Sequence, residues 1–475
     1  MESISLIASV LILFFLIFHL NFTFVYNSTD EPYRDEPYLL DYNLKVETLV
    51  KGLESPTTMA FLDKNNILVL EKNDGTVRRI SNGVLLAEPV LDVNVANEDE
   101  RGMLGIATFP EEDFVKNSTQ NTRYVFLYYS TSEHLKRDGE DKCPDEDPEE
   151  PTERTSPCED PYPILSRLYR YEWQNDKLVN PKLLLTIPAS PVADHLGGAL
   201  SMGPDGNLYV AVGDGDSCKS GYCYQNFTNS VLNSVTSNFE NGTQPLGRGG
   251  ILTINQDGQD TGYNIFGETH PIDKYYSYGL RNSFGIDFDP ISNKLWDTEN
   301  GPGFGDEINL VEAGFNSGWA KVQGIWPVPN YTASPEKFGL WDSSKQNITN
   351  PISNLFDFNG RGKYSSPEFS WNFTNAPTAL KFYSSDKLGK HYENDLFVGD
   401  YGRGNIYHFE LNEERSELVL TSELQDKVAN TQEEVEDIIF GKFFGRITDI
   451  EVGPDGYIYI VSIDRGEIYR IVPAF

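Results

Sequence analysis

Short runs of alternating apolar and polar residues, separated by turn residues, fill the chain from about Leu44 to its end. One unit recurs: an Asp-Gly or Asn turn, a short apolar strand, a second turn and another strand. Copies lie at 65–80, 205–210, 292–296, 394–407 and 455–469, and another is expected from 123–129 with 166–169. This period-2 pattern predicts β-strands, and helical periodicity is nearly absent.

The repetition of this unit indicates the fold class. About six copies lie in the 475-residue chain, and repeated four-stranded units arranged radially form a β-propeller. The sequence therefore predicts an all-β protein in which residues 44–475 form a six-bladed β-propeller. A strand at 44–50 is expected to pair into the final blade and close the ring. Two β-sandwiches are the alternative, but no linker interrupts the middle of the chain.

The N-terminal residues have a different character. Residues 4–25 are nearly all apolar, which predicts that 1–25 is a signal peptide or an uncleaved N-terminal membrane anchor. The two remain alternatives because the basic residues typical of a signal peptide are missing and no small-residue cleavage site stands out. The polar, proline-containing residues 26–43 are expected to be a linker.

The charge of the chain narrows the choice of partners. It has 72 Asp and Glu residues against 38 Lys and Arg, a formal charge of −34, which argues against nucleic acid and anionic membrane surfaces. Eight N-x-S/T sequons agree with an exported, extracellular or cell-surface glycoprotein. They lie at Asn21, Asn27, Asn117, Asn226, Asn241, Asn330, Asn347 and Asn372.

The four cysteines form two local pairs by spacing, Cys143 with Cys158 and Cys218 with Cys223. An exported chain with an even count predicts two disulfides. A zinc site is the alternative, but the intervals are irregular and no histidine lies close in sequence. The first pair lies in an acidic insertion at 138–160, which is expected to be a solvated, disulfide-tied loop; calcium or partner binding is the other interpretation.

A predicted hairpin between His195 and Asp214 carries the first candidate chemistry. Gly-Pro-Asp-Gly at 203–206 supplies its turn. A register that pairs Met202 with Leu208 places His195 within one residue of Asp214, where cross-strand neighbours lie about 5 Å apart. A carboxylate beside an imidazole fixes its tautomer and stabilises the imidazolium, as in a general base. A purely structural hydrogen bond is the alternative.

Four other stretches are too specific for ordinary strands: DERGMLGI at 99–106, YGLRNSFG at 278–285, TENGPGFGDEINL at 298–310 and GRITDI at 445–450. With the hairpin and Gly-Trp at 318–319, they resemble the soluble glucose/sorbosone dehydrogenase family, six-bladed propellers that bind pyrroloquinoline quinone (PQQ) and calcium. The resemblance covers about residues 45–472. It implies oxidation of a sugar hydroxyl, with hydride transfer to the quinone and electrons passed to an external acceptor.

The resemblance also implies roles for the matching residues. His195 is expected to take the hydroxyl proton and Asp214 to orient the imidazole. Arginines suit a flat polyanion such as PQQ, and the residues expected to contact the cofactor are Glu100, Arg281, Asn282, Arg403 and Arg446. Calcium takes carbonyl and carboxylate oxygens, and its expected ligands are Gly301 and Pro302, with Asp306 and Glu307 as structural or second-site ligands.

Some positions depart from the family pattern. Glu100 stands where these dehydrogenases often have a glutamine, and Thr448 where a second cofactor-binding arginine is often found. A lysine expected near Arg403 is absent, although Arg403 can substitute for it. Fewer cations and an extra carboxylate should weaken binding of a trianion. Two other functions therefore stay open: a non-catalytic, calcium-binding propeller of the hedgehog-interacting-protein type that binds glycan or protein, and a calcium-dependent hydrolase or lactonase.

Overall fold

Almost all regular structure in the computed structural model is β-strand, with a few short 3₁₀ turns between strands. The structure describes residues 36–109, 123–140, 163–189, 193–215, 218–219, 222–223, 234–238, 242–243, 245–325 and 351–475. Pro37–Phe475 form one unit. The apolar segment predicted at 1–25 and the acidic insertion from residue 141 to 160 lie outside the described residues. Among the residues described, no helix is long and apolar enough to cross a membrane.

The described strands form six sheets of four or more strands, in sequence order along the chain. The first contains β3 (Pro56–Asp63), β4 (Asn66–Glu71), β5 (Thr76–Ser81), β6 (Val84–Leu85) and β7 (Leu91–Asp92). The second contains β8 (Met103–Thr108), β9 (Arg123–Thr131), β10 (Leu165–Gln174) and β11 (Lys177–Pro188). The third contains β12 (Leu200–Met202), β13 (Leu208–Val212), β16 (Gly250–Ile254), β17 (Tyr275–Tyr278), β21 (Phe315–Asn316) and β22 (Lys363–Tyr364).

The other three sheets follow in the same way. The fourth contains β18 (Ser283–Phe288), β19 (Leu295–Glu299), β20 (Asp306–Val311), β23 (Phe369–Trp371) and β27 (Val428–Ala429). The fifth contains β24 (Pro377–Phe382), β25 (Leu396–Asp400), β26 (Ile406–Phe409), β28 (Ile439–Lys442) and β1 (Tyr38–Leu39). The sixth contains β29 (Ile447–Val452), β30 (Ile458–Ser462), β31 (Glu467–Pro473) and β2 (Leu44–Lys51).

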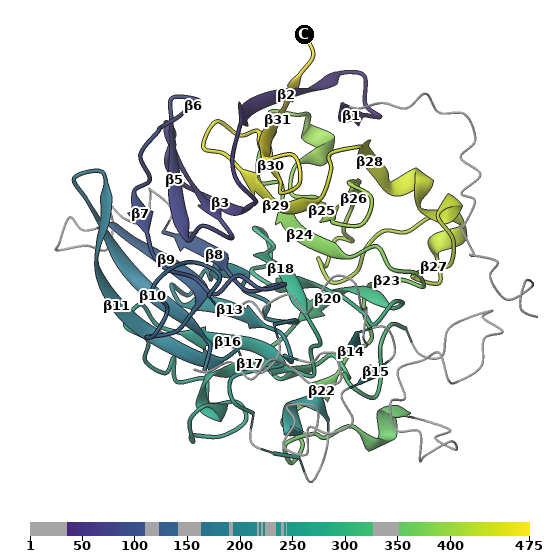
Figure 1. The fold of residues 1–475 in the computed structure, drawn as a ribbon. Coiled ribbons are helices and arrows are strands. Elements are labelled where there is room, and N and C mark those ends of the chain that lie inside the picture. Colours follow the sequence, from purple (N-terminus) through teal and green to yellow (C-terminus); the bar gives the residue numbers. More distant parts are fainter. Residues whose placement is uncertain are drawn as a thin grey trace, which may run out of the picture. The chain divides into compact units, whose positions relative to one another are not determined.

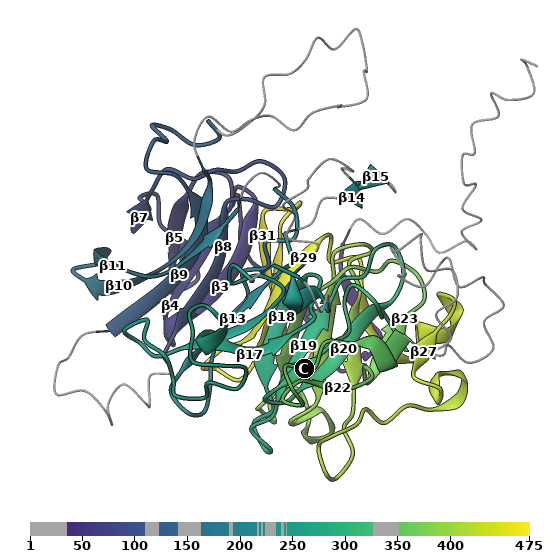
Figure 2. The same cartoon turned by 90° about the horizontal axis from the view of Figure 1, so that it is seen from below.

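The first strand of each sheet contacts the first strand of the next sheet. These contacts run in the order β3, β8, β12, β18, β24 and β29 and return to β3, and Figures 1 and 2 show the sheets following one another in this order. A closed order of inner strands is the arrangement of a β-propeller and is incompatible with two separate β-sandwiches. The prediction of an all-β propeller is confirmed.

The ends of the unit meet in one sheet. β2 pairs antiparallel with β31, and Val46 lies opposite Ile471, which confirms the predicted pairing of strand 44–50 with the last sheet. The predicted linker at 26–43 differs from the structure at its C-terminal end. Tyr38 lies opposite Lys442 in the β1–β28 pair, and Leu39 is buried; an aromatic contact between Tyr38 and Phe443 fixes this strand further.

The apolar runs of the central strands are explained by packing on both faces. Every residue of β13 and of β30 is buried, because neighbouring sheets cover both sides of these strands. Large aromatic side chains fill the layers between sheets, such as Trp296, Phe382 and Tyr407 between the fourth and fifth sheets. Rigid sheets of this kind hold the loops at their ends in fixed positions.

Candidate functional site

The candidate residues gather where the inner strands begin. Glu100 precedes β8, His195 precedes β12, Arg281 and Asn282 precede β18, and Arg446 precedes β29. Because these strands are neighbours in the ring, their starts surround one end of the central channel. Glu100 and Asn282, which are 182 positions apart in the sequence, therefore come into contact.

The hairpin folds as predicted and forms the buried pair at its open end. Met202 lies opposite Leu208, and Nδ1 of His195 lies 2.8 Å from Oδ1 of Asp214. His195 has a φ of +54°, a left-handed conformation that is uncommon for histidine and often found at functional sites. Its carbonyl accepts a hydrogen bond from Gly215 N at 3.1 Å. With Nδ1 directed to the carboxylate, Nε2 is the nitrogen that can accept a proton.

The second oxygen of Asp214 has a partner that the sequence does not reveal. Nε1 of Trp319 donates to Oδ2 of Asp214 at 2.6 Å, and the two residues are 105 positions apart. The guanidinium of Arg281 lies over the same indole, 5.5 Å from the ring centroid. The Gly-Trp motif at 318–319 was the only sequence signal for Trp319, and it indicated no role.

Arg281 and the 300–301 turn form the next part of the cluster. Nη1 of Arg281 donates to the carbonyl of Asn300 at 2.8 Å and to that of Gly301 at 3.1 Å. The carbonyl of Arg281 accepts from Asp214 N at 2.8 Å. The predicted cation therefore lies beside the His195–Asp214 pair, and its side chain faces a carbonyl that was expected to bind calcium.

Glu100 lies in the same cluster. Its carboxyl accepts from Leu196 N at 3.2 Å and from Nδ2 of Asn282 at 3.3 Å. Burial raises the pKa of Glu100, and the nearby charge of His195 opposes this. Asn282 is buried, and its Oδ1 has no hydrogen-bond partner among the described residues. Two polar groups predicted to contact the cofactor are thus adjacent, and one has a free acceptor.

Arg446 lies directly before β29, and Arg403 lies between β25 and β26. Nη1 of Arg446 donates to the hydroxyl of Tyr401 at 3.1 Å, and the guanidinium lies over that ring. Both arginines are exposed, and the backbone N–H of Arg403 donates to Oδ1 of Asp400 at 2.6 Å. Thr448 donates instead to the carbonyl of Pro56 and so links the sixth sheet to the first.

The two carboxylates predicted as calcium ligands are both buried and differ in their surroundings. Asp306 accepts three backbone N–H groups, from Gly301, Asn375 and Ala376. These bonds fix the shape of the 300–305 turn and occupy both oxygens of Asp306. Glu307 faces Glu299 across the β19–β20 pair, and the hydroxyl of Ser317 donates to both.

Asp297 joins Glu299 and Glu307 in a buried carboxyl cluster that the sequence did not indicate. Burial raises the pKa of Asp297 to about 7 and that of Glu307 to about 8. Burial raises the pKa of Glu299 as well, and the charges of Glu307 and Asp297 add to this. Within the described ranges no cation forms an ion pair with these carboxyls. The hydrogen bonds of Asn309 and Ser283 to Asp297 lower its pKa less than burial raises it.

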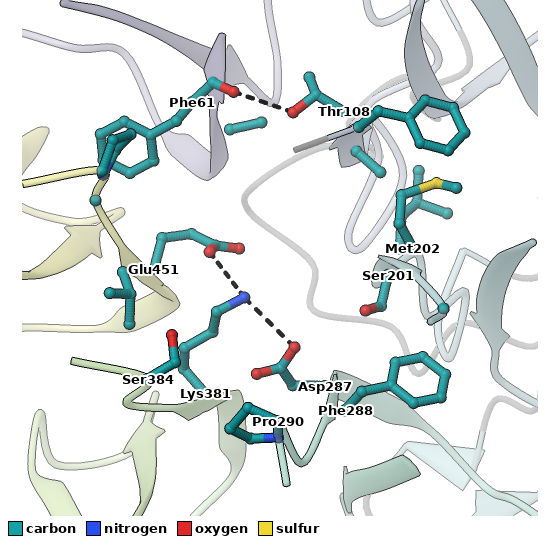
Figure 3. Close-up of a pocket in the computed structure, with 18 of the residues that line it drawn as sticks. Phe61, Thr108, Ser201, Met202, Asp287, Phe288, Pro290, Lys381, Ser384 and Glu451 are labelled. Atoms are coloured by element: carbon teal, nitrogen blue, oxygen red, sulfur yellow. Dashed lines mark hydrogen bonds and ion pairs between the residues drawn. The ribbon is translucent and has the colours of Figure 1, made fainter. Parts of the chain in front are cut away.

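A cavity of about 1550 Å³ lies at the other end of the channel. It is lined by the last residues of the inner strands, such as Asp63, Thr108 and Met202, with Lys381 between Asp287 and Glu451 on its wall (Figure 3). None of the predicted site residues lines it. The cavity and the His195 cluster therefore occupy opposite ends of the inner strands.

Close contact between β8 and the loop before β12 supports the position of His195. A Cβ atom on Gly105 would lie only 2.0 Å from the carbonyl oxygen of Gly198. We expect Gly105→Ala to displace this loop, to lower the free energy of unfolding by about 1–3 kcal/mol and to reduce any activity that depends on His195. Thermal unfolding and an activity assay measure the two effects.

Gly206→Ala is the matched control, because a Cβ there meets nothing within 4 Å although φ is +77°. It should cost about 1 kcal/mol of stability and leave activity unchanged. Equal effects of the two substitutions on activity would contradict the role of Gly105.

Comparison with known proteins identifies the family and the relatives that this chain resembles. A sequence model described as Glucose / Sorbosone dehydrogenase matches residues 53–470. The aldose sugar dehydrogenase of Escherichia coli is 24% identical over 437 residues, covering 90% of this chain and 93% of the relative. Quinoprotein glucose dehydrogenase B of Acinetobacter calcoaceticus is 25% identical over 465 residues, covering 90% of this chain and 87% of the relative.

Solved structures show the same fold. The apo form of the E. coli aldose sugar dehydrogenase aligns with a TM-score of 0.62 at 21% identity, covering 90% of this chain and 99% of that one. The PQQ-bound aldose sugar dehydrogenase from Streptomyces coelicolor aligns with a TM-score of 0.55 at 18% identity, covering 92% and 99%.

Proposed function

The chain belongs to the glucose/sorbosone dehydrogenase family, and from this premise we propose that it oxidises a sugar hydroxyl with PQQ as its cofactor. The observation that carries the proposal is the joining of His195, Asp214 and Arg281 in one hydrogen-bonded cluster at one end of the channel. The quinoprotein and PQQ-bound relatives support the choice of cofactor.

Each residue of the cluster has a separate role in the proposed reaction. His195 Nε2 takes the proton of the sugar hydroxyl, and Asp214 holds the imidazole in the tautomer that leaves Nε2 available. Bound PQQ would supply the hydride acceptor for this oxidation, in which the hydroxyl becomes a carbonyl, and an external acceptor would take up the two electrons. Arg281 supplies positive charge beside the reacting groups. Gly197 and Gly198 allow the loop to pack closely, because a Cβ there would lie 2.6 Å from the carbonyl oxygen of Ala211 and 2.7 Å from Cβ of Leu104.

The donor set fits PQQ. The cofactor carries carboxylates and quinone oxygens, and Arg281 offers a guanidinium group within the cluster, while Arg403 and Arg446 are exposed arginines of the fifth and sixth sheets. The unpaired amide oxygen of buried Asn282 marks a polar position without a protein partner among the described residues. Burial raises the pKa of Glu100, and this lowers the cost of placing the carboxyl beside a polyanion.

Calcium also fits, at the buried carboxyl cluster. Among the described residues no three His, Cys, Asp or Glu side chains converge as a metal site. A calcium ion would therefore take at most two carboxylates, such as those of Glu299 and Glu307, and complete its shell with carbonyl, amide or hydroxyl oxygens. The full burial of Asp297, Glu299 and Glu307 close to one another supports a cation site at this cluster. At Gly301 and Pro302 a bound ion would have to share the carbonyl of Gly301 with Arg281.

Removal of calcium tests this assignment without any activity. We expect chelation by EGTA to lower the unfolding temperature, because two buried carboxyls then lose their counter-ion, and we expect added Ca²⁺ to restore it. In a Glu307→Gln variant the difference between chelated and calcium-loaded protein should shrink. An unfolding temperature that is the same with EGTA and with Ca²⁺ would reject the site.

Three structural features complete the proposal. We propose that each of the six sheets is one blade, which the closed order of inner strands supports. The protein is exported as a glycoprotein, either free or tethered by residues 1–25; of the eight sequons, Asn372 alone lies in the described residues. A Cys218–Cys223 disulfide is supported by the backbone register, in which these residues are opposite each other in β14 and β15, and the Cys143–Cys158 pair lies outside the described residues.

The decisive experiment is reconstitution. The purified protein is loaded with PQQ and Ca²⁺ and assayed for dye reduction over a panel of aldoses, while the quinone absorbance is followed. Sugar-dependent bleaching of the dye supports the proposal. Absence of both dye reduction and absorbance change across the panel rejects it.

A second function is favoured by one observation. Glu100 places a carboxyl, rather than a neutral amide, between Leu196 N and Asn282, and an ionised carboxylate there would repel PQQ. On this interpretation the chain is a non-catalytic calcium-binding propeller that binds glycan or protein. Binding of PQQ in a titration of the calcium-loaded protein distinguishes the two, because only the dehydrogenase requires it.

A further inference from the structure

We propose that Trp319 is a positioning residue that holds the His195–Asp214 pair and Arg281 in one fixed geometry. This inference rests on the proposed function for its catalytic meaning, but the contacts themselves are independent of any cofactor. Trp319 is 2% exposed, it donates to Asp214 through Nε1 at 2.6 Å, and its ring face lies under the Arg281 guanidinium. One side chain therefore touches both the carboxylate and the cation.

The backbone of Trp319 is itself held in place. Its N–H donates to the carbonyl of Gly279 at 2.9 Å, and its carbonyl accepts from Nδ2 of Asn238 at 2.7 Å. The fold therefore fixes the indole before any ligand arrives. The indole N–H then fixes the orientation of the Asp214 carboxyl, because its two oxygens have different partners. Oδ1 pairs with Nδ1 of His195, and Oδ2 accepts from Nε1 of Trp319.

The indole also sets how strongly Asp214 attracts a proton to His195. A donor on Oδ2 stabilises the carboxylate charge, so that less of this charge is left to stabilise the imidazolium. If the donor is removed, a buried oxygen loses its partner, and the His195–Asp214 pair takes up a proton more readily. Other charged groups also lie near the pair. Glu100 and Asp194 are the acidic ones, Arg248 interacts with Asp214, and Arg281 lies above the indole. The substitution changes none of them.

The test is Trp319→Phe, which keeps an aromatic ring and removes the N–H. NMR titration of the imidazole, in protein without PQQ or sugar, should show a His195 pKa raised by about one unit relative to the wild type. Trp296→Phe is the matched control, since Trp296 is also fully buried but its Nε1 has no hydrogen-bond partner in the described structure. It should leave the His195 pKa unchanged.

Activity provides a second readout if the reconstituted enzyme turns over sugar. The acidic limb of the kcat profile should then move to higher pH by the same amount in Trp319→Phe. If the His195 pKa is shifted in Trp319→Phe but neither the wild type nor a variant oxidises sugar, the dehydrogenase function is rejected and the positioning role stands. An unshifted His195 pKa, with or without turnover, would overturn the positioning role.

A measurement on another variant covers the case in which Trp319→Phe does not fold. One of the six indole N–H resonances should move when Asp214 is changed to Asn, because its acceptor loses its charge. The same spectrum of His408→Gln, which alters a remote His–Asp pair, should show no such change. If no indole resonance moves in Asp214→Asn, the contact between Trp319 and Asp214 is absent in solution and the proposal fails.

Discussion

Replacing His195 with glutamine is expected to lower kcat for sugar oxidation by a factor on the order of 10²–10⁴, the usual contribution of a general base. The buried Asp214 carboxylate keeps its hydrogen bond from Nε1 of Trp319, so we expect the fold to be preserved. What is lost is the nitrogen that accepts the hydroxyl proton. Steady-state dye reduction in the PQQ- and calcium-loaded protein measures the effect, and KM for the sugar should change much less than kcat.

The chain offers a matched control for this substitution. Nε2 of His408 lies 2.8 Å from Oδ2 of Asp395 in the fifth sheet, the same pairing at a position far from the inner strands' starts. His408→Gln should leave kcat within about twofold of the wild type. If His408→Gln and His195→Gln reduce kcat equally, the loss reflects general damage to the fold, and the assignment of His195 as the base fails.

Asp214→Asn separates orientation from proton transfer. The amide can no longer stabilise the imidazolium, and it favours the wrong tautomer if its NH₂ group faces Nδ1. We therefore expect a loss in kcat of the same order as for His195→Gln, and a double variant that is little worse than either single one. Additive losses would indicate that the two residues act separately.

The features that local patterns determine could be predicted from the sequence. The turn at 203–206 and the alternation of Leu208–Val212 define a hairpin register, and this register alone brings His195 to Asp214. The pairing of 44–50 with the last sheet follows from the need of a propeller to close its ring. In each case a short-range pattern, or a rule of the fold class, allows only one pairing of the strands.

Contacts between distant segments could not be predicted in this way. Nothing in the sequence around Trp319 indicates that its indole N–H reaches Asp214, because that contact depends on the return of the chain from β20 in the fourth sheet to β21 in the third. The role of Asp306 was ambiguous for the same reason. Its position after the 300–305 turn suggested a metal ligand. In the structure it accepts three backbone N–H groups from two separate segments. The buried cluster at Asp297, Glu299 and Glu307 requires knowledge of which strand faces are covered.

The charged cluster around Lys381 was also absent from the sequence analysis, and it gives the largest expected effect on stability. Nζ of Lys381 lies 2.9 Å from Glu451 and 3.4 Å from Asp287, with the two carboxylates on either side of it in Figure 3. Asp449 lies in the same charged group, and it raises the pKa of Lys381. The ammonium group therefore links the inner strands β18, β24 and β29 of three neighbouring sheets.

Lys381→Met is expected to lower the free energy of unfolding by about 3 kcal/mol. Removing one partner of a buried ion pair typically costs about 3–5 kcal/mol, and the side chains here retain 13–28% of their exposure, which places the effect at the low end. Urea unfolding measures it. Lys51→Met is the control: its pair with Glu467 is equally short at 2.8 Å, but the lysine is 69% exposed, so the change should stay below about 1 kcal/mol.

The pH dependence of the loss of stability in Lys381→Met identifies the cause of that loss. Burial raises the pKa of Asp449 to about 7, above its usual value of about 4. A carboxyl with a raised pKa in the folded state stabilises the fold at low pH and loses that contribution as the pH rises from about 4 to 7. Without Lys381 the pKa values of Asp449 and Glu451 rise further, because the charge of the lysine lowers both. The deficit of Lys381→Met should therefore be larger at pH 8 than at pH 5, where protonation removes the unpaired charges. A deficit that is equal at both pH values would mean that lost packing of the lysine side chain, and not uncompensated charge, is responsible.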